Sequence, residues 1–353
     1  MQKTVVPGVA MWSVWQPDRN LFFNSYFIET PQGNLAIDPL PLSETDAQEI
    51  AARGGIRWVV ITNRDHERDS ANVRERFGAS VAAATPDSAE LRVPVERTLG
   101  DRDLLATARI LALDGLKTAG EFALWFGDRR TIVVGDALWG DPAGSVRLMP
   151  DEKLADPAAA ALSLRRLRAR NPLHLLVGDG TPIFGRAFEV ISACLDARAG
   201  VFTNRVNLDE LVIERSTSGP APFRAGWAEI GQLIGARRLG YQLALLAPGD
   251  AFCPLHWHTA EEELFIVWEG EPTLRSPRGE TRLRPGDLVA FPTDPAGAHK
   301  LINESDAPCK VLMIANNDPH DVCFYPDSKK HLVEATETLV RSEPILDYYD
   351  GEV

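Results

Sequence analysis

Short apolar runs alternate with amphipathic stretches through the first two hundred residues, and this pattern predicts strands and helices in turn. The apolar runs predict two strands within 24–38, around a Pro-Gln-Gly-Asn turn, and further strands at 57–62, 80–84, 121–126, 131–135 and 173–177. The amphipathic stretches predict helices at 44–53, 70–77 and 157–170. Because strands come first and strand and helix then alternate, we expect an α/β domain with αββα layering.

The second half of the chain predicts mostly strands. Glu263 begins an apolar run in which Phe265 and Val267 share its face, and another strand is predicted at 287–291. Between the halves we expect a short strand at 212–215, a Pro/Gly-rich loop at 216–222, and a loop rather than a helix at 225–234. Near the end we expect a helix at 332–341, followed by an apolar and aromatic stretch. The expected organisation is a first domain at 1–200, a linker at 201–237, a second domain at 238–330 and a tail at 331–353.

The composition indicates which classes of binding partner and which cellular location to expect. The chain has 353 residues and a net charge of −13, which argues against nucleic acid or an anionic membrane surface as a partner, because either needs a basic patch. Its four cysteines are widely scattered, as in reduced cytosolic proteins. No apolar run approaches the ~20 residues that cross a bilayer, and no secretory signal is evident. We therefore expect a cytoplasmic protein that binds a small molecule.

Three histidines and one glutamate in the second half have spacings that suit a mononuclear metal site. His256 and His258 are two residues apart, so in an extended strand their side chains share a face. Glu263 begins the apolar run, and His299 follows the strand at 287–291. Four such groups without an ion would be costly to desolvate, so we expect one divalent transition metal here. The ligand set suits Fe, Mn, Ni, Cu or Zn and would leave coordination positions for water or substrate.

These residues resemble the two motifs of the cupin superfamily. The motif positions are Gly249, His256, His258, Glu263 and Gly270 for the first, and Gly286, Pro292, His299 and Asn303 for the second. The chain departs from the pattern in the six residues, rather than five, before His256 and in a longer loop before His299. The resemblance covers about residues 238–330 and implies an all-β double-stranded β-helix, or jelly-roll barrel, of a kind that commonly forms homodimers. Such sites serve dioxygenases, isomerases and decarboxylases in the superfamily.

The order of elements over about residues 5–200 resembles the metallo-β-lactamase fold. The positions expected to correspond to the family's metal-ligand loops are Asn63, Asp65, Glu67, Arg68, Lys117, Asp136 and Asp179. Only His66 and His174 precede residue 200. A shift of one residue in the loop alignment would bring His66 into the site, whereas His174 lies inside an apolar strand and is expected in the core.

A dizinc hydrolase uses several imidazoles to hold its ions, so we expect this half to hold no zinc and to be catalytically inactive. Asp65, Asp136 and Asp179 would leave negative charge in a cleft. We hypothesise that Lys117 and Arg68 replaced the ions in a buried salt-bridge cluster. The alternative is a carboxylate-only site for Mg²⁺ or Mn²⁺.

Three functions follow from these observations. The first is a metal-dependent enzyme of the oxygenase, isomerase or lyase type, with its chemistry in the barrel. The second is a non-catalytic small-ligand binding or sensing module, because no clear general base, nucleophile or cofactor fingerprint accompanies the metal site. The third, hydrolysis in the N-terminal half, ranks last because that half has few histidines.

Other side chains near the site could either take part in binding or have only a surface or structural role. The arginines of the Ser-Pro-Arg-Gly hairpin could hold an anionic substrate, but we expect solvated charges: Arg275, Arg278, Arg282 and Arg284. Glu261 and Glu262 are expected at the rim. Cys253 could line the pocket, but we expect a small buried residue there.

Overall fold

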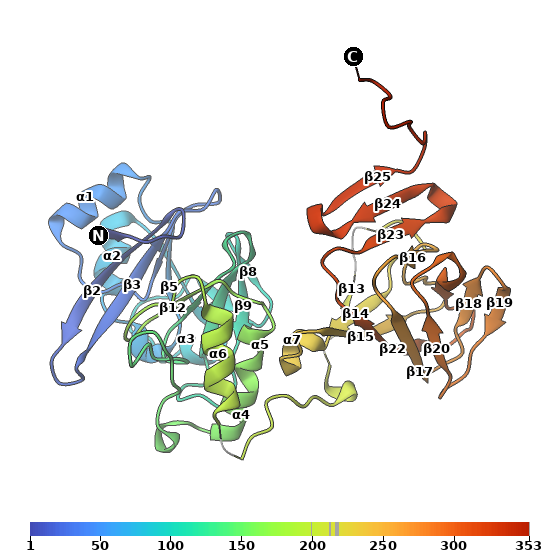
Figure 1. The fold of residues 1–353 in the computed structure, drawn as a ribbon. Helices are drawn as coiled ribbons and strands as arrows, with labels where there is room; N and C mark the ends of the chain where they lie inside the picture. The colour runs from blue at the N-terminus through green and yellow to red at the C-terminus, as the bar shows by residue number, and fades with distance from the viewer. Residues whose placement is uncertain (199, 212, 216–218, 353) are drawn as a thin grey trace. The chain divides into compact units, whose positions relative to one another are not determined.

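The computed structural model describes residues 1–198, 200–211, 213–215 and 219–352. The chain forms two compact units, Met1–Asn204 and Arg205–Val353 (Figure 1). Within the described ranges, no helix has the length and apolar character needed to span a bilayer.

Two sheets form the inside of the first unit. The first sheet runs in chain order through β1 (Gln2–Lys3), β2 (Val9–Gln16), β3 (Leu21–Ile28), β4 (Leu35–Ile37), β5 (Trp58–Ile61), β6 (Ser80–Ala84) and β7 (Arg97–Leu99). The second has the order β12 (His174–Val177), β11 (Thr131–Val134), β10 (Phe122–Phe126), β9 (Ala108–Ala112) and β8 (Leu104–Leu105). Their apolar faces meet in one buried cluster, in which Tyr26 and Ile28 of β3 lie with Phe122 and Leu124 of β10.

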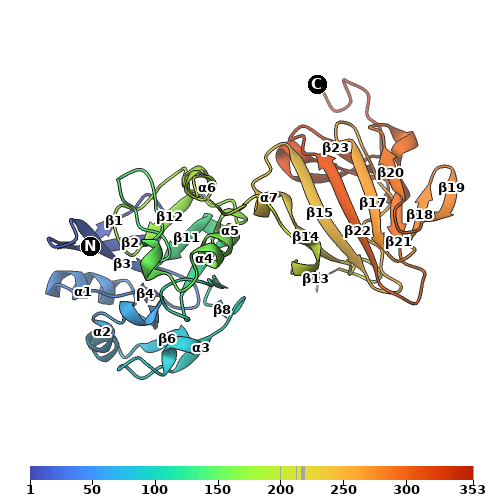
Figure 2. The same ribbon diagram turned by 90° about the horizontal axis from the view of Figure 1, so that it is seen from below.

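Helices cover the outer faces of both sheets (Figure 2). They are α1 (Glu44–Ala52), α2 (Ser70–Phe77), α3 (Thr85–Ser88), α4 (Pro157–Ser163), α5 (Arg165–Arg168) and α6 (Ala187–Asp196). Ile50 of α1 and Val73 of α2 are buried against the first sheet, whereas Leu167 of α5 and Ile191 of α6 are buried against the second. The expected αββα layering is therefore confirmed. The helix predicted at 157–170 is divided at Leu164, whose ψ of −14° departs from the α-helical value towards 3₁₀ geometry.

The second unit consists mainly of strands in three sheets. The largest has the order β13 (Glu214–Arg215), β14 (Gly226–Glu229), β15 (Leu239–Leu246), β22 (Cys309–Asn316), β17 (Glu263–Glu269) and β20 (Leu288–Phe291). The others are β16 (Trp257–His258), β23 (Val322–Tyr325), β24 (Lys330–Val333) and β25 (Thr338–Arg341), and β19 (Gly279–Arg282), β18 (Thr273–Ser276) and β21 (Lys300–Ile302). A short helix, α7 (Gly231–Ile234), lies between β14 and β15.

The sheets enclose one apolar core, in which Phe265 of β17 and Leu274 of β18 are buried together. The two smaller sheets meet at His256 and His299, whose backbones exchange both hydrogen bonds at 3.1 and 2.9 Å. Gly270 ends β17 with a φ of +77°, and a Cβ there would lie 2.6 Å from the sulfur of Cys309. This motif position therefore requires glycine both for its conformation and for its close packing. The unit is the expected cupin-type barrel.

The structure differs from two expectations for the segment between the domains. Part of the predicted linker, 201–237, belongs to the barrel, because β13 and β14 extend the sheet from β15. The predicted loop at 225–234 is strand β14 and helix α7. In β14 the buried Ala228 alternates with the exposed Glu229, but the small size of Gly226 and Ala228 conceals this pattern in the sequence. Of the strand predicted at 212–215, residue 212 lies outside the described residues.

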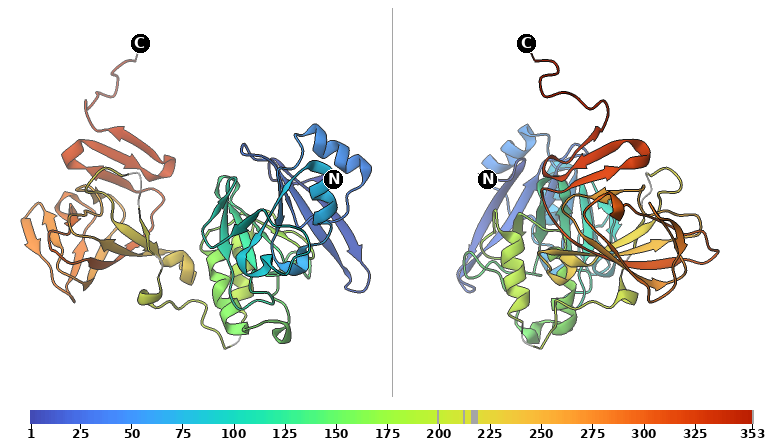
Figure 3. Two further views of the ribbon diagram at one scale, coloured as in Figure 1. Left: turned by 180° about the vertical axis from the view of Figure 1, so that it is seen from behind. Right: turned by 45° about the vertical axis from the view of Figure 1, so that its right-hand side comes forward.

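The helix predicted at 332–341 is wrong, because the segment continues the sheet from β23. Strands β24 and β25 pair from Lys330 with Arg341 to Val333 with Thr338, and this hairpin is drawn in red in Figure 3. Glu337 has a φ of +50° in the turn between them. All four residues of β25 are exposed, so no buried face distinguishes a strand from a helix there, and the edge of β23 decides between them.

Candidate metal centre

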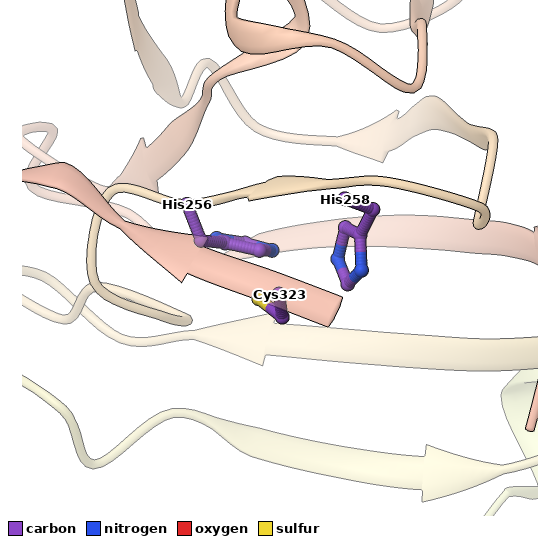
Figure 4. A group of neighbouring side chains, drawn as sticks. All are labelled: His256, His258 and Cys323. Atoms are coloured by element: carbon purple, nitrogen blue, oxygen red, sulfur yellow. The ribbon is translucent and has the colours of Figure 1, made fainter. Parts of the chain in front are cut away.

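The His-x-His pair lies at the start of β16, where the two smaller sheets meet. His256 pairs with His299 across the bridge, and His258 pairs with Cys323 on β23. Figure 4 shows His256, His258 and Cys323 on these neighbouring segments. The strand alternation places both imidazoles on the inner face, as predicted, while Trp257 stacks on Phe324 with a centroid separation of 4.6 Å.

The four predicted ligands lie together, with the three imidazoles close to one carboxylate oxygen of the fourth, Glu263. Glu263 Oε2 lies 3.2 Å from His299 Nε2, 3.5 Å from His258 Nε2 and 3.9 Å from His256 Nε2. His256 and His299 are buried, at 8% and 1% exposure. These residues are distributed over 44 positions of the chain, from 256 to 299, and the barrel fold brings them close enough to bind a single ion.

The second nitrogen of each imidazole has its own partner. His256 Nδ1 lies 2.9 Å from Pro254 O, and His299 Nδ1 lies 3.0 Å from Gly297 O. Because a carbonyl oxygen only accepts, both Nδ1 atoms donate, and in the neutral ring the Nε2 lone pair points to the centre. His258 Nδ1 lies 2.6 Å from Asp321 Oδ2, which gives the third ring the same orientation. Fixed tautomers of this kind are typical of metal-binding histidines.

Asp321 is a functional residue that the sequence analysis missed. It is fully buried and also accepts hydrogen bonds from the backbone N–H groups of Thr259 and Ala260, at 2.9 and 2.7 Å. These contacts hold its carboxylate against His258. Burial raises the pKa of Asp321, but the hydrogen bond from His258 outweighs burial and lowers it, so the carboxylate is ionised.

The residues fit a divalent cation because two buried acceptors face each other. Among the described residues, neither Glu263 Oε2 nor His299 Nε2 has a hydrogen-bond partner. With His299 neutral, two acceptors 3.2 Å apart leave both lone pairs unsatisfied, which is costly in a buried site. A cation between them satisfies both.

The imidazoles differ in their preferred charge. Burial, reinforced by His299, lowers the pKa of His256 to about 4. Burial also lowers the pKa of His258, but hydrogen bonds with Cys323 and Asp321 outweigh it and raise the value to about 10. A bound cation would take over from the His258 proton as the countercharge to Glu263.

The remaining side chains named for this region lie outside the ligand set. Glu261 is at the rim, 20% exposed, and accepts a hydrogen bond from Asp318 N at 2.9 Å. The hairpin arginines form ion pairs outside the site: the half-buried Arg275 pairs with Asp327, and the exposed Arg282 and Arg284 pair with Glu271 and Asp287. The thiol of Cys253 is held protonated, because burial, assisted by the charge of Glu263, raises its pKa to about 12.

The first unit contains a second buried polar cluster, centred on His66. Nδ1 of His66 lies 2.8 Å from Asp38 Oδ2, and Nε2 lies 3.6 Å from Asp136 Oδ1. Arg68 Nη2 lies 3.2 Å from Asp179 Oδ1, with side-chain exposures of 8% and 2%. Burial and the Arg68 charge lower the pKa of His66, but Asp38 and Asp136 outweigh them and raise it to about 10. A protonated His66 and Arg68 therefore balance the carboxylates.

Two acidic side chains of this cluster, Asp179 and Glu121, have raised pKa values that favour their neutral forms. Burial raises the pKa of Asp179 to about 6. Burial and the Asp136 charge raise the pKa of Glu121 well above its usual range. One oxygen of Glu121 accepts from the backbone N–H groups of Asp136 and Ala137, and Glu121 Oε2 has no hydrogen-bond partner among the described residues.

The structure corrects several roles predicted for this half. Lys117 pairs with Asp65 at side-chain exposures of 45% and 36%, so this pair is not part of the buried cluster. Glu67 accepts from Arg92 N and Val93 N at 3.0 and 2.8 Å, which holds the 92–93 loop.

Asn63 and His66 belong to the same short turn. Asn63 accepts from Asp65 N at 2.9 Å and begins the 3₁₀ turn Arg64–His66. This turn carries His66, rather than Asp65, into the cluster. The remaining histidine, His174, is half-buried at the start of β12 and accepts from Gly185 N at 3.3 Å.

No curated protein matches the chain. Several solved structures are similar to part of the chain. A sugar phosphate isomerase of the cupin superfamily from Silicibacter pomeroyi is 24% identical, with 41% of this chain and 98% of that chain covered and a TM-score of 0.36. A polyketide cyclase from Streptomyces resistomycificus is 20% identical, with 32% and 79% covered and a TM-score of 0.29. A metallo-beta-lactamase from Pontibacter korlensis is 13% identical, with 56% and 98% covered and a TM-score of 0.45.

Two family models match the chain. The metallo-beta-lactamase superfamily matches residues 1–194, and the cupin domain matches residues 242–315. The first match covers more than half of the 353 residues. The chain therefore belongs to the metallo-beta-lactamase superfamily, with a cupin domain as its second unit.

Proposed function

We propose that the barrel binds one divalent transition metal through His256, His258, Glu263 and His299 and acts with it as an enzyme on a small molecule. One observation carries this proposal: a buried oxygen of Glu263 faces the buried Nε2 of His299, and neither has a hydrogen-bond partner among the described residues. Iron, manganese, nickel, copper and zinc all suit three imidazoles and a carboxylate. Oxygenase, isomerase and lyase reactions are all compatible with such a centre.

The residues around the ligands would prepare the site for substrate. Asp321 fixes the tautomer and orientation of His258. Phe291 stacks on the His299 ring at 3.8 Å and Phe265 meets it edge-on at 5.1 Å, so one wall of the site is dry. When bound, the metal supplies a Lewis acid or, for a redox-active ion, an electron acceptor.

Tyr325 is the neutral donor closest to this chemistry. Its ring lies parallel to the His256 ring at a centroid separation of 6.1 Å. Burial raises the pKa of Tyr325 above its ordinary value, so its hydroxyl stays protonated at neutral pH. It can therefore donate a hydrogen bond to a substrate oxygen and hold it in place.

We further propose that the first unit works without a metal and is catalytically inactive. Arg68 and a protonated His66 supply the positive charge that zinc supplies in an active metallo-β-lactamase, and they pair with Asp38, Asp136 and Asp179. A divalent ion bound among these residues would stand next to the Arg68 guanidinium, and that repulsion disfavours binding.

Elemental analysis of the protein, with Glu263→Ala beside it, tests both proposals. We expect about one equivalent of a transition metal per chain, lost in the variant. Glu262→Ala, next in sequence but outside the ligand set, should retain the metal. Two zinc ions that survive Glu263→Ala would instead place the metal in the first unit and favour hydrolysis there.

A further inference from the structure

Cys323 lies next to the proposed metal ligands, although the sequence gives no sign of it. It is directly opposite His258 in the β16–β23 pair, and residues opposite each other in an antiparallel pair project to the same face. The neighbouring pair, Trp257 and Phe324, stacks on the other face. Cys323 is 2% exposed, and Figure 4 shows it beside the two imidazoles.

The ligand atoms of the barrel form two overlapping sets. His256, Glu263 and His299 offer two nitrogens and an oxygen within 4.8 Å of one another. His256, His258 and Cys323 offer two nitrogens and a sulfur within the same limit. His256 belongs to both sets, so they are adjacent parts of one centre. The pairing of the small sheets thus brings a hard ligand and a soft ligand close to the same imidazole.

We propose that the Cys323 sulfur is a further ligand of the metal centre and makes the barrel selective for borderline and soft ions. The inference rests on the proposed function, because it needs a metal in the barrel. Thiolate favours zinc, cobalt(II) and copper(I), whereas carboxylate favours manganese and other hard ions. Binding exchanges the thiol proton for a metal–sulfur bond, and that proton leaves to the solvent in addition to the proton that the ion displaces from His258.

The surroundings of Cys323 suit a ligand better than an inert core thiol. A buried free cysteine usually packs as a small apolar residue. Cys323 instead faces polar groups: His258 lies directly opposite it in the strand pair, and its sulfur lies within 4.8 Å of a nitrogen of both His256 and His258. Cys253 is the nearest comparison, since it also lies close to Glu263, but it belongs to neither set.

Cobalt(II) is the probe, because it substitutes for zinc and reports its ligands in its absorption spectrum. With one equivalent of cobalt(II), we expect the full-length protein to show visible d–d bands together with a near-ultraviolet sulfur-to-cobalt charge-transfer band. Cys323→Ser should lose the charge-transfer band and keep the d–d bands, because the imidazoles still bind. Cys253→Ser should keep both. The dissociation constants for cobalt and zinc should rise roughly tenfold in Cys323→Ser, with a smaller change for manganese.

The wild-type spectrum alone can overturn the proposal, whether or not the variant folds. Visible bands without a charge-transfer band would mean that cobalt binds but sulfur does not take part, which leaves the proposed function standing. A charge-transfer band that persists in Cys323→Ser and disappears in Cys253→Ser would assign the sulfur to Cys253 and overturn the inference. No cobalt absorption of either kind would refute the metal site itself.

Discussion

The barrel and the first unit each bury a histidine among carboxylates, yet the two clusters differ in which atoms are left unpaired. In the barrel, Glu263 Oε2 and His299 Nε2 face each other without hydrogen bonds from the described residues. In the first unit, both nitrogens of His66 lie near carboxylates, and the guanidinium of Arg68 lies against Asp179. The cluster of the first unit includes a guanidinium, which stays charged, whereas the ligand set of the barrel consists only of imidazoles and a carboxylate.

This difference shows that residue type alone does not identify a metal site. His66, Asp136 and Asp179 lie close enough to hold an ion, as do the residues of the barrel. Their charges are already balanced, however, and an added ion would have to displace Arg68 or deprotonate His66. The presence of a competing cation, rather than the number of candidate ligands, separates the two clusters.

The largest expected effect is the loss of metal from the barrel. His256→Ala combined with His258→Ala removes two of four ligands, and we expect affinity to fall by about a thousandfold or more, which is roughly 4 kcal/mol. Elemental analysis after dialysis measures the loss. His331→Ala is the matched control, because this half-buried histidine pairs with Ser342 instead. Retention of a full equivalent of metal in the double variant would refute the ligand assignment.

Removal of the Arg68 guanidinium should have the next largest effect, on the stability of the first unit. Arg68→Met leaves Asp179 buried without its partner and also removes the guanidinium hydrogen bond to Asn24 O. We expect the free energy of unfolding of this unit to fall by roughly 3–5 kcal/mol, measured by calorimetry. Arg92→Met, whose side chain is 86% exposed, should leave the transition in place. Zinc that raised the transition temperature of Arg68→Met to the wild-type value, without changing the wild type, would sharpen the comparison between the clusters. It would show that the Arg68 charge prevents metal binding in the first unit.

Alkaline pH should weaken the first unit in the same way. His66 has a pKa of about 10 in the folded chain and an ordinary value of about 6.5 in the unfolded chain. The folded state therefore binds the extra proton above pH 6.5, and its stabilising contribution is lost as pH rises through 10. Glu121, with its raised pKa, acts in the same direction.

We expect the free energy of unfolding to fall by about 1 kcal/mol for each pH unit between 7 and 9. Melts of the wild type and of His66→Gln over this range measure the slope. An equal slope in both would show that His66 is neutral in the folded protein and would remove one of the two cations from the comparison.

The two clusters also differ in how far the sequence could predict them. The barrel ligands follow from local rules, since a two-residue spacing on a strand places His256 and His258 on one face. Asp321 is 63 residues from His258, and only the pairing of β16 with β23 brings them together. The same register places Cys323 in the site, and spacing within the chain gives no information about it.

In the first unit, local turn geometry rather than long-range strand pairing limited the prediction. The layers of this unit were predicted from the alternation of strands and helices. Arg68, Asp136 and Asp179 were also predicted in its cluster and lie there, but Asp65 and Lys117 do not. The loop order suggested Asp65 and Lys117, whereas the short 3₁₀ turn Arg64–His66 directs His66 inward. A one-residue difference in the turn changes which side chain is buried, and the sequence pattern does not resolve that difference.

The buried carboxylate beside His258 should have a moderate effect on metal binding. Asp321→Asn keeps the size of the side chain but places an amide where the carboxylate accepts the Nδ1 proton. We expect metal affinity to fall by roughly 10- to 100-fold, measured by competition with a chromophoric chelator. Asp318→Asn, nearby but without a contact to a ligand in the described structure, is the control. An unchanged affinity would mean that the barrel backbone alone orients His258.

Lys117→Met should have the smallest effect, and it separates position from charge in the first unit. Lys117 and Asp65 form an ion pair at 45% and 36% exposure, and surface pairs of this kind contribute up to about 1 kcal/mol. Burial raises the pKa of Asp136, His66 and Trp139 lower it, and the Lys117 charge lowers it less than they do. We therefore expect the calorimetric transition of the first unit to shift far less than in Arg68→Met, and raised salt should shrink the difference further. A loss as large as that of Arg68→Met would mean that Lys117 compensates the buried carboxylates from the edge of the cluster, so that the charge balance extends beyond the buried residues.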